Sequence, residues 1–170
     1  MDEKLEIKYR DNMLRLIIYL IIFILGVVFS SFISTKRTYQ TECVTIEADG
    51  YVVLKLWDIK KGSSYKFQQA RKDAVHCILF SGISSINGCS TQPPLLNNSE
   101  EQEKFKATEK TFFAKNGAWS MFTRSSAVET TLPSNIGTNN WKVYQVSISK
   151  NELRKYLEDQ NIIKALNNGF

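Results

Sequence analysis

The pattern of apolar and polar side chains changes abruptly near the start of the chain. Residues 16–34, LIIYLIIFILGVVFSSFIS, carry no charged side chain. At about 1.5 Å per residue, a helix of this length just crosses a hydrocarbon core of roughly 30 Å. A helix also satisfies its backbone N–H and C=O groups within lipid, which an open strand does not. The pattern therefore predicts a leader at 1–15 and one transmembrane helix at 16–35.

A cleaved secretory signal is the competing interpretation of this apolar run. The apolar region of a signal peptide has about 7–15 residues and ends at a cleavage site with small residues. Val28-Phe29-Ser30 resembles such a site, but apolar residues continue through Ile33, and the leader before the run is long and charged. We therefore favour a retained anchor that contacts membrane lipid through residues 16–35.

The basic residues that flank the run predict its orientation. The flank before the run has the larger share of them, with Lys4, Lys8, Arg10 and Arg15 against Lys36 and Arg37. Because basic residues concentrate on the cytoplasmic side, we expect the N-terminus in the cytoplasm. The rest of the chain would then lie beyond an inner membrane, in the periplasm of a bacterium.

After a short tether at 36–43, the apolar pattern has a period of two. From Val44 to Trp57 the apolar residues that share one face are Val44, Ile46, Ala48, Val52, Leu54 and Leu56. The Asp49-Gly50 step in the middle is a strong hairpin signal. We favour a hairpin of two short strands, although one long bulged strand fits the same pattern.

Three later stretches have the 3.6-residue period of amphipathic helices. Residues 65–80 place apolar side chains at 67, 70, 74, 77 and 78, with Ser63 or Ser64 as the expected cap. Residues 99–115 begin with a capping box, Ser99-Glu100-Glu101-Gln102, and end at Asn116-Gly117. A second capping box at residues 149–152 begins the last helix, whose apolar stripe is Leu153, Tyr156 and Leu157.

Two further strands, at 118–124 and 141–148, complete the expected domain, with a polar connection at 125–140 between them. The pattern thus predicts an α+β domain at 44–170, in which about three helices pack on one face of a small, mainly antiparallel sheet. The core residues that we expect are Val52, Leu54, Phe67, Ala74, Ile78, Phe112, Tyr144 and Val146.

Two apolar segments outside these elements are candidates for contacts with a partner protein. The loop at 84–98 is longer than an ordinary connection, and Leu95 and Leu96 after its two prolines either pin it to the domain or contact a partner. The C-terminal segment carries Ile162, Ile163 and Phe170, which either dock on the domain or contact a partner. These five residues form the possible partner surface.

The three cysteines carry more information about the cellular compartment than about a metal site. None forms a CxxC motif, and His76 is the single histidine, so a zinc site built from Cys and His lacks ligands. Cys77 shares a face with core positions of the predicted helix. Cys43 and Cys89 are therefore the candidates for a disulfide in an oxidising compartment, with two unpaired thiols as an equally acceptable alternative.

Charge adds little to this picture. Once the six basic and four acidic residues of the first 37 positions are set aside, the remainder has 16 basic and 13 acidic residues, so we expect no binding to nucleic acid. A local basic patch is interpreted as a solvated helix face, with lipid headgroups or another anionic envelope polymer as the alternative; its residues are Lys60, Lys61, Lys66, Arg71 and Lys72. The glutamates of 100–109 alternate with lysines, which is typical of paired surface charges, so we expect no metal or cofactor.

One segment resembles known proteins. Residues 69–83, QARKDAVHCILFSGI, follow a strand that ends in Leu56-Trp57. This arrangement resembles a group of uncharacterised bacterial envelope proteins with a QAxxxAVxxxLFxGI helix behind the first strand of an exported domain. It is also similar to small α+β modules of periplasmic lipoproteins and flagellar accessory proteins. The resemblance covers about 40 residues; it implies an envelope location and an assembly-type role, and it transfers no catalytic residue.

These observations favour a non-enzymatic, membrane-anchored subunit of an envelope assembly for secretion, conjugation or transport, which binds other envelope proteins or itself. The alternatives are a membrane-tethered periplasmic enzyme and a ligand-binding or sensory module. An enzyme would need a nucleophile with a base, but His76 and Cys77 are adjacent and point about 100° apart on a helix. His76 could still meet Cys43 or Cys89 in space. We assign no catalytic residue.

Overall fold

The computed structural model describes residues 37–85, 89–129 and 141–165. Within these ranges the sheet strands are β1 (Tyr39–Ile46), β2 (Tyr51–Asp58), β3 (Thr123–Glu129) and β4 (Val143–Ser149). The α-helices of the same ranges are α2 (Phe67–His76), α3 (Ser99–Phe112) and α4 (Lys150–Asp159). The predicted transmembrane helix at 16–35 lies outside the described residues. Among those that are described, no helix has the length and apolarity to span a bilayer.

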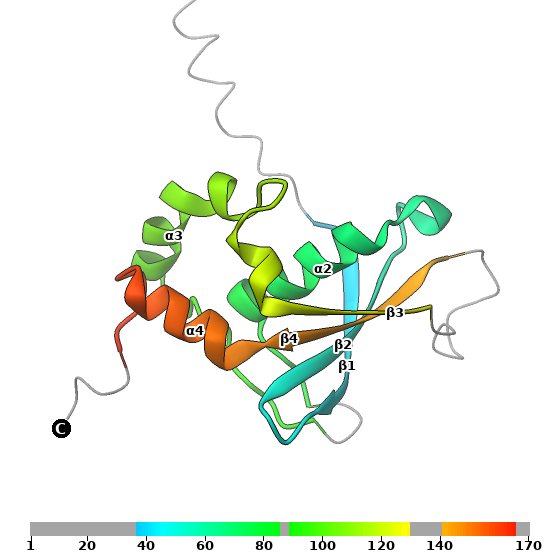
Figure 1. Ribbon diagram of the computed structural model, residues 1–170, viewed down its shortest axis with the longest axis horizontal. Coiled ribbons are helices and arrows are strands. Elements are labelled where there is room, and N and C mark those ends of the chain that lie inside the picture. The colour runs from blue at the N-terminus through cyan, green and yellow to red at the C-terminus, as the bar shows by residue number, and fades with distance from the viewer. Residues whose placement is uncertain (1–36, 86–88, 130–140, 166–170) are drawn as a thin grey trace, which may run out of the picture. The chain divides into compact units, whose positions relative to one another are not determined.

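The strands form one antiparallel sheet in the order β1-β2-β4-β3, with α2 lying along one of its faces (Figure 1). Figure 1 also shows α3 and α4 beside each other toward one end of the sheet. Thr38–Phe170 is one compact unit of the chain. The predicted α+β class, with an antiparallel sheet and three α-helices, is therefore confirmed for the described part of the chain.

The first two strands form the hairpin that the Asp49-Gly50 step favoured. Gly50 has a φ of +82°, and its N–H donates to the carbonyl of Glu47 at 2.9 Å. The hairpin begins earlier than predicted, because residues 39–43 of the expected tether belong to β1. A β-bulge between Cys43 and Thr45 shifts the register, so that Cys43 pairs with Leu54 and Ile46 pairs with Val52. The bulge reverses the alternation, and Cys43 instead of Val44 is therefore buried.

The core lies between the sheet and α2. Alanines at 70 and 74 are fully buried and let the helix backbone approach the sheet closely. Of the eight predicted core residues, seven are buried: Val52, Leu54, Ala74, Ile78, Phe112, Tyr144 and Val146. The eighth, Phe67, is half-buried and packs against the ring of Tyr144 at 5.5 Å between centroids.

Two of the three predicted helix starts, those of α2 and α3, differ from the structure by one or two residues. Lys66 occupies the N-cap position of α2 without a side-chain hydrogen bond, while Ser63 and Ser64 belong to a 3-10 turn at Gly62–Ser64. In α3 the cap is Asn98 instead of Ser99, because the Asn98 Oδ1 accepts the N–H of Glu101 at 2.9 Å. Several donors can fill a cap position, so sequence alone leaves a choice of one or two residues.

The strand predicted at 118–124 is mostly a 3-10 turn, Ala118–Phe122, and β3 extends instead into the region expected to be a polar connection. Trp119 and Phe122 are both buried, whereas Met121 is 65% exposed. The turn has a period of three, so Trp119 and Phe122 point the same way, which the alternating pattern of a strand does not allow.

Candidate functional site

The possible partner surface is mostly interior. Leu95, Leu96, Ile162 and Ile163 are buried, which favours the alternative that they pin their segments to the domain over an exposed contact with a partner. The N–H groups of Leu95 and Leu96 donate to the carbonyls of Ile78 and Leu79 at 3.0 and 2.9 Å, which holds both side chains against the core. Phe170, the last of the five, lies outside the described residues.

The long loop at 84–98 is held by covalent and backbone contacts. A disulfide joins Cys43 of β1 to Cys89 of the loop, the pair that the sequence favoured, across 46 residues. Ile83 and Gln92 exchange backbone hydrogen bonds of 2.8 and 2.9 Å. Gly82 precedes them with a φ of +73°, and a Cβ there would lie 2.4 Å from the carbonyl oxygen of Gln92. The loop is thus fastened to the sheet by features that its length alone does not reveal.

A small pocket of about 130 Å³ lies beside this disulfide, between β1 and the π-helical turn Cys77–Ser81. The free thiol of Cys77 lines it, donates to the carbonyl of Gly82 at 3.3 Å and lies 3.6 Å from the Thr41 hydroxyl oxygen. Burial raises the pKa of Cys77, and the hydrogen bond from Thr41 offsets this only in part. A buried thiol with a raised pKa is a poor nucleophile at neutral pH.

His76 sits in an aromatic cluster. Its Nδ1 lies 2.7 Å from the Tyr39 hydroxyl, and its ring packs against Phe80 at 4.6 Å between centroids. His76 is half-buried against β1. Because Cys43 and Cys89 are joined to each other, neither offers a thiol for this imidazole to activate.

A buried polar pair joins α2 to the residue Tyr65 that precedes it. Asp73 of α2 is only 2% exposed. Its carboxylate accepts hydrogen bonds from the Tyr65 hydroxyl and from the Gln69 amide, both at 3.0 Å. Burial and the charge of Asp73 raise the pKa of Tyr65 far above its ordinary value, so the phenol stays protonated. The signal that could have found this pair is an Asp between two alanines of the apolar stripe, Ala70 and Ala74.

The basic patch of the sequence divides into two parts. Arg71 and Lys72 both lie against the ring of Trp119, at 5.2 and 5.3 Å from its centroid. The Arg71 Nε donates to the Thr123 hydroxyl at 2.8 Å, and the Lys72 Nζ donates to the Phe113 carbonyl at 2.5 Å. The interpretation as a solvated face is therefore wrong for these two side chains, which join α2 to the segment after α3. Lys60, Lys61 and Lys66 are exposed.

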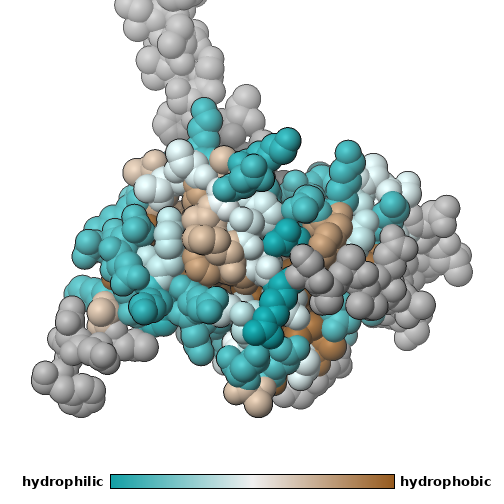
Figure 2. Space-filling view, viewed as in Figure 1, coloured by the Kyte–Doolittle hydropathy of each residue, from teal (hydrophilic) through white to brown (hydrophobic). Residues whose placement is uncertain are grey.

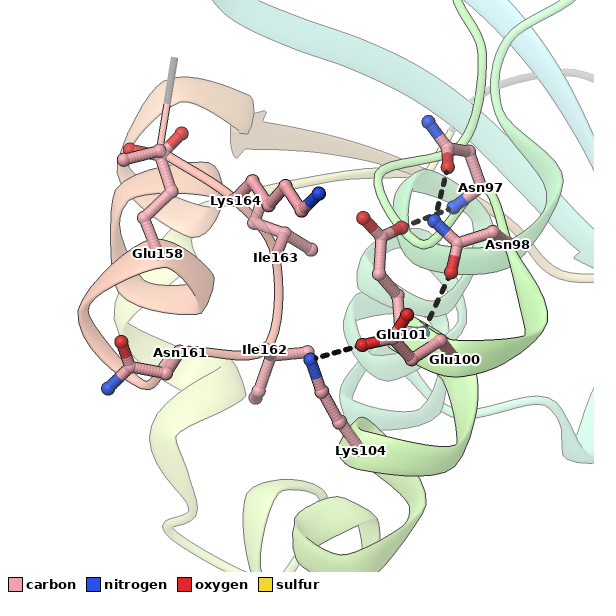
Figure 3. Close-up of a pocket in the computed structure, with 11 residues that line it drawn as sticks. Asn97, Asn98, Glu100, Glu101, Lys104, Glu158, Asn161, Ile162, Ile163 and Lys164 are labelled. Atoms are coloured by element: carbon pink, nitrogen blue, oxygen red, sulfur yellow. Dashed lines mark hydrogen bonds and ion pairs between the residues drawn. The ribbon is translucent and has the colours of Figure 1, made fainter. Parts of the chain in front are cut away.

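A larger recess of about 610 Å³ lies between the start of α3 and the segment after α4 (Figure 3). Asn97, Asn98 and the first turn of α3 form one side, and residues 161–165 form the other. Two glutamates of this recess are ion-paired, Glu100 with Lys104 at 2.7 Å and Glu158 with Arg154 at 3.0 Å, and Glu101 accepts the N–H of Asn97 at 3.0 Å. The recess thus presents compensated charges rather than a carboxylate pair for catalysis.

Surface chemistry around the recess is hydrophilic. Figure 2 shows that polar side chains cover most of the face formed by the helices, with small hydrophobic areas between them. Within residues 37–85, 89–129 and 141–165, no three His, Cys, Asp or Glu side chains gather in a way that could hold a metal ion. No family model matches the chain, and comparisons with curated proteins and with solved structures also gave no match.

Proposed function

We propose that this protein is a non-enzymatic, single-pass subunit of a bacterial envelope assembly. Its residues 16–35 anchor it in the inner membrane, and the domain from Thr38 onward lies in the periplasm. The disulfide between Cys43 and Cys89 carries the proposal, because disulfides persist in oxidising compartments and are rare in the cytosol. The preceding apolar run, with most of the flanking basic residues on its N-terminal side, supports the same orientation.

The contacts of the chemically able side chains support a binding role over an enzymatic one. Cys77 is buried with a raised pKa, and the other two cysteines are joined to each other. The imidazole of His76 contacts the Tyr39 hydroxyl and the Phe80 ring. Tyr65 and Asp73 satisfy each other inside the fold. These side chains could act as nucleophile or base in an enzyme, but here their contacts stabilise the domain.

Interaction with other envelope proteins, or with further copies of the chain, is the role that such a domain supports best. Its polar surface and the recess with compensated charges at the start of α3 suit contacts between folded proteins. The resemblance implies an envelope location and an assembly-type role, and we propose an assembly for secretion, conjugation or transport.

The topology can be tested with two single-cysteine probes in intact cells. Met121→Cys places a thiol at an exposed site of the domain, and Lys8→Cys places one in the leader. A maleimide that crosses only the outer membrane should label the first variant without lysis and the second only after the inner membrane is broken. Labelling of Lys8→Cys in intact cells, or recovery of the protein in a soluble fraction, would contradict the proposal.

The assembly role needs a separate test. The tagged protein, expressed at its natural level and cross-linked in intact cells, should migrate in a discrete complex after extraction in mild detergent. The wild type and the Met121→Cys variant should form the same complex. Migration as a monomer under all cross-linking conditions would count against a role in an assembly.

A further inference from the structure

We infer that the turn after β2 is a contact surface for the anionic headgroups of the membrane in which the chain is anchored. Ile59 and Met121 are the two exposed large hydrophobic side chains among the described residues, with exposed fractions of 49% and 65%. Ile59 belongs to this turn and is followed by two exposed lysines, Lys60 and Lys61. The inference rests on the proposed membrane anchor.

Two more residues join the turn from the beginning of β4. The N–H of Lys142 donates to the carbonyl of Gly62 at 3.4 Å, and a Cβ added to Gly62 would lie 3.3 Å from the Trp141 ring. Lys142 is exposed and Trp141 is half-buried. We define the Ile59 surface as Ile59, Lys60, Lys61, Trp141 and Lys142.

The composition of the Ile59 surface suits the boundary between lipid and water. Tryptophan is enriched at that boundary, aliphatic side chains enter the acyl region, and lysines attract anionic headgroups. The one acidic residue of the turn, Asp58, is buried, and its carboxylate faces inward to the N–H groups of Lys60 and Lys61 at 2.9 and 3.1 Å. The Lys61 Nζ also lies 3.7 Å from the Asp58 carboxylate, so the outward positive charge of the turn comes mainly from Lys60.

The length of the connecting chain brings this surface close to the bilayer. The Thr38 hydroxyl lies 3.0 and 2.9 Å from the two carboxylate oxygens of Asp58, next to Ile59. Lys36 and Arg37 alone separate Thr38 from the end of the proposed span at residue 35. A residue spans at most about 3.6 Å when extended, so Thr38 lies within roughly 11 Å of that end. Headgroups extend about 5–8 Å beyond each side of the hydrocarbon core, which puts the turn within their reach.

Met121 supplies an internal control at the opposite end of the sheet. The strand after it begins at Thr123, which pairs with Ile148, while Tyr51 at the hairpin end of β2 pairs with Ser149. Asp58 is at the other end of β2, and seven residue steps at about 3.3 Å separate the two ends by roughly 23 Å. A domain that rests on the Ile59 surface therefore holds Met121 well away from the headgroups.

The test uses the full-length protein in lipid nanodiscs that contain either phosphatidylglycerol or only phosphatidylcholine, with headgroups that carry a nitroxide quencher. A fluorophore is attached to Ile59→Cys or to Met121→Cys; Cys77 is buried and the remaining cysteines are joined. We expect the nitroxide to quench the probe at 59 severalfold more than the probe at 121 in phosphatidylglycerol discs. The difference should shrink in discs of phosphatidylcholine alone.

Charge reversal identifies the side chains responsible. Lys60→Glu, Lys61→Glu and Lys142→Glu together should reduce quenching at 59 to the level found at 121. The matched variant reverses three exposed lysines of α3, Lys104→Glu, Lys106→Glu and Lys110→Glu, and should leave quenching at 59 unchanged. Equal quenching at the two sites, equal quenching in both lipids, or no effect of the first triple variant would overturn the inference.

Failure of the inference differs from failure of the proposed function. A protein that does not co-elute with the nanodiscs has no membrane anchor, and this result would contradict both. A protein that co-elutes but shows equal quenching at 59 and 121 would contradict the inference alone.

Discussion

The hydroxyl of Thr38 lies 3.0 and 2.9 Å from the two carboxylate oxygens of Asp58, where the first strand begins and the second strand ends. The Asp58 carboxylate also accepts the N–H groups of Lys60 and Lys61. One buried carboxylate thus fixes both the entry of the chain into the domain and the turn that leads toward α2.

Removal of this carboxylate should destabilise the domain. Asp58→Ala leaves two backbone N–H groups and the Thr38 hydroxyl without their acceptor, which should lower the free energy of unfolding by about 2–3 kcal/mol. Thr38→Val removes one of these hydrogen bonds and should cost about 1 kcal/mol. Urea denaturation of the full chain in detergent micelles, followed by near-UV circular dichroism, measures both. Glu103→Ala, at an exposed ion pair with Lys106 in α3, is the control and should change stability by less than about 0.5 kcal/mol.

The same residue predicts a loss of stability in acid. Burial acts to raise the pKa of Asp58, but the hydrogen bonds from Thr38, Lys61 and Lys60 and the charge of Lys61 outweigh it and lower the pKa below the ordinary value of 3.8. A carboxyl whose pKa is lower in the folded state stabilises the fold above its ordinary pKa. This stabilisation disappears as the pH falls through the folded-state pKa.

Asp58→Asn should therefore flatten the dependence of stability on pH below about pH 4, while it lowers the stability at neutral pH. Urea midpoints of the wild type and the variant, measured from neutral pH to about pH 2, provide the comparison. If the two curves stay parallel through the acid range, Asp58 does not carry this part of the acid sensitivity.

Loss of the Cys43–Cys89 disulfide should also destabilise the domain. The bridge closes a loop with a sequence separation of 46. A chain-entropy estimate of the stabilisation from a loop of that size is roughly 4 kcal/mol, and engineered disulfides often stabilise by less than such an estimate. We expect Cys89→Ser together with Cys43→Ser to lower the free energy of unfolding by about 2–4 kcal/mol. Cys77→Ser removes a cysteine without opening the loop, so it should cost less than the double variant. A double variant as stable as the wild type would show that Leu95, Leu96 and the Ile83–Gln92 hydrogen bonds hold the loop without the disulfide.

Arg71 should stabilise the fold more than the exposed Lys66 does. Its guanidinium packs on Trp119 and donates to Thr123, and burial lowers its pKa. Arg71→Met keeps the aliphatic stem but loses these contacts, which should lower the free energy of unfolding by about 2 kcal/mol. Lys66→Met, at an exposed position before the same helix, should change it by less than about 0.5 kcal/mol. Thermal unfolding followed by tryptophan fluorescence distinguishes the two, and equal effects would contradict the structural role of Arg71.

Local patterns in the sequence predicted the element types well and the element boundaries less well. Asp49-Gly50 predicted the hairpin, and the stripe of Ala70, Ala74 and Ile78 predicted which face of the helix packs on the sheet. The bulge at Val44 has no local signal, because Cys43 and Val44 are both suitable for burial. The turn at 118–122 reads as a strand since Trp119, Met121 and Phe122 are all typical strand residues.

The functional features were harder to predict because they depend on contacts between distant residues. Leu95 and Leu96 look like an exposed apolar pair in a long loop, and only hydrogen bonds to Ile78 and Leu79 reveal that they are core residues. Burial of Asp73 depends on Tyr65, which lies eight positions earlier and outside the regular part of the helix. Elimination of Cys77 left Cys43 and Cys89 as the candidate pair, but the sequence did not decide between a disulfide and two free thiols; the structure contains the disulfide.

Intact-mass measurement of the protein extracted from membranes tests the central claim most directly. The account predicts the full chain of 19.5 kDa, including the first 36 residues, in a membrane fraction that resists alkaline washing. It also predicts a mass lower by two hydrogen atoms than the reduced chain, with a single cysteine alkylated after denaturation. A shortened chain in the soluble fraction, or three alkylated cysteines, would contradict a membrane-anchored, exported domain with a disulfide.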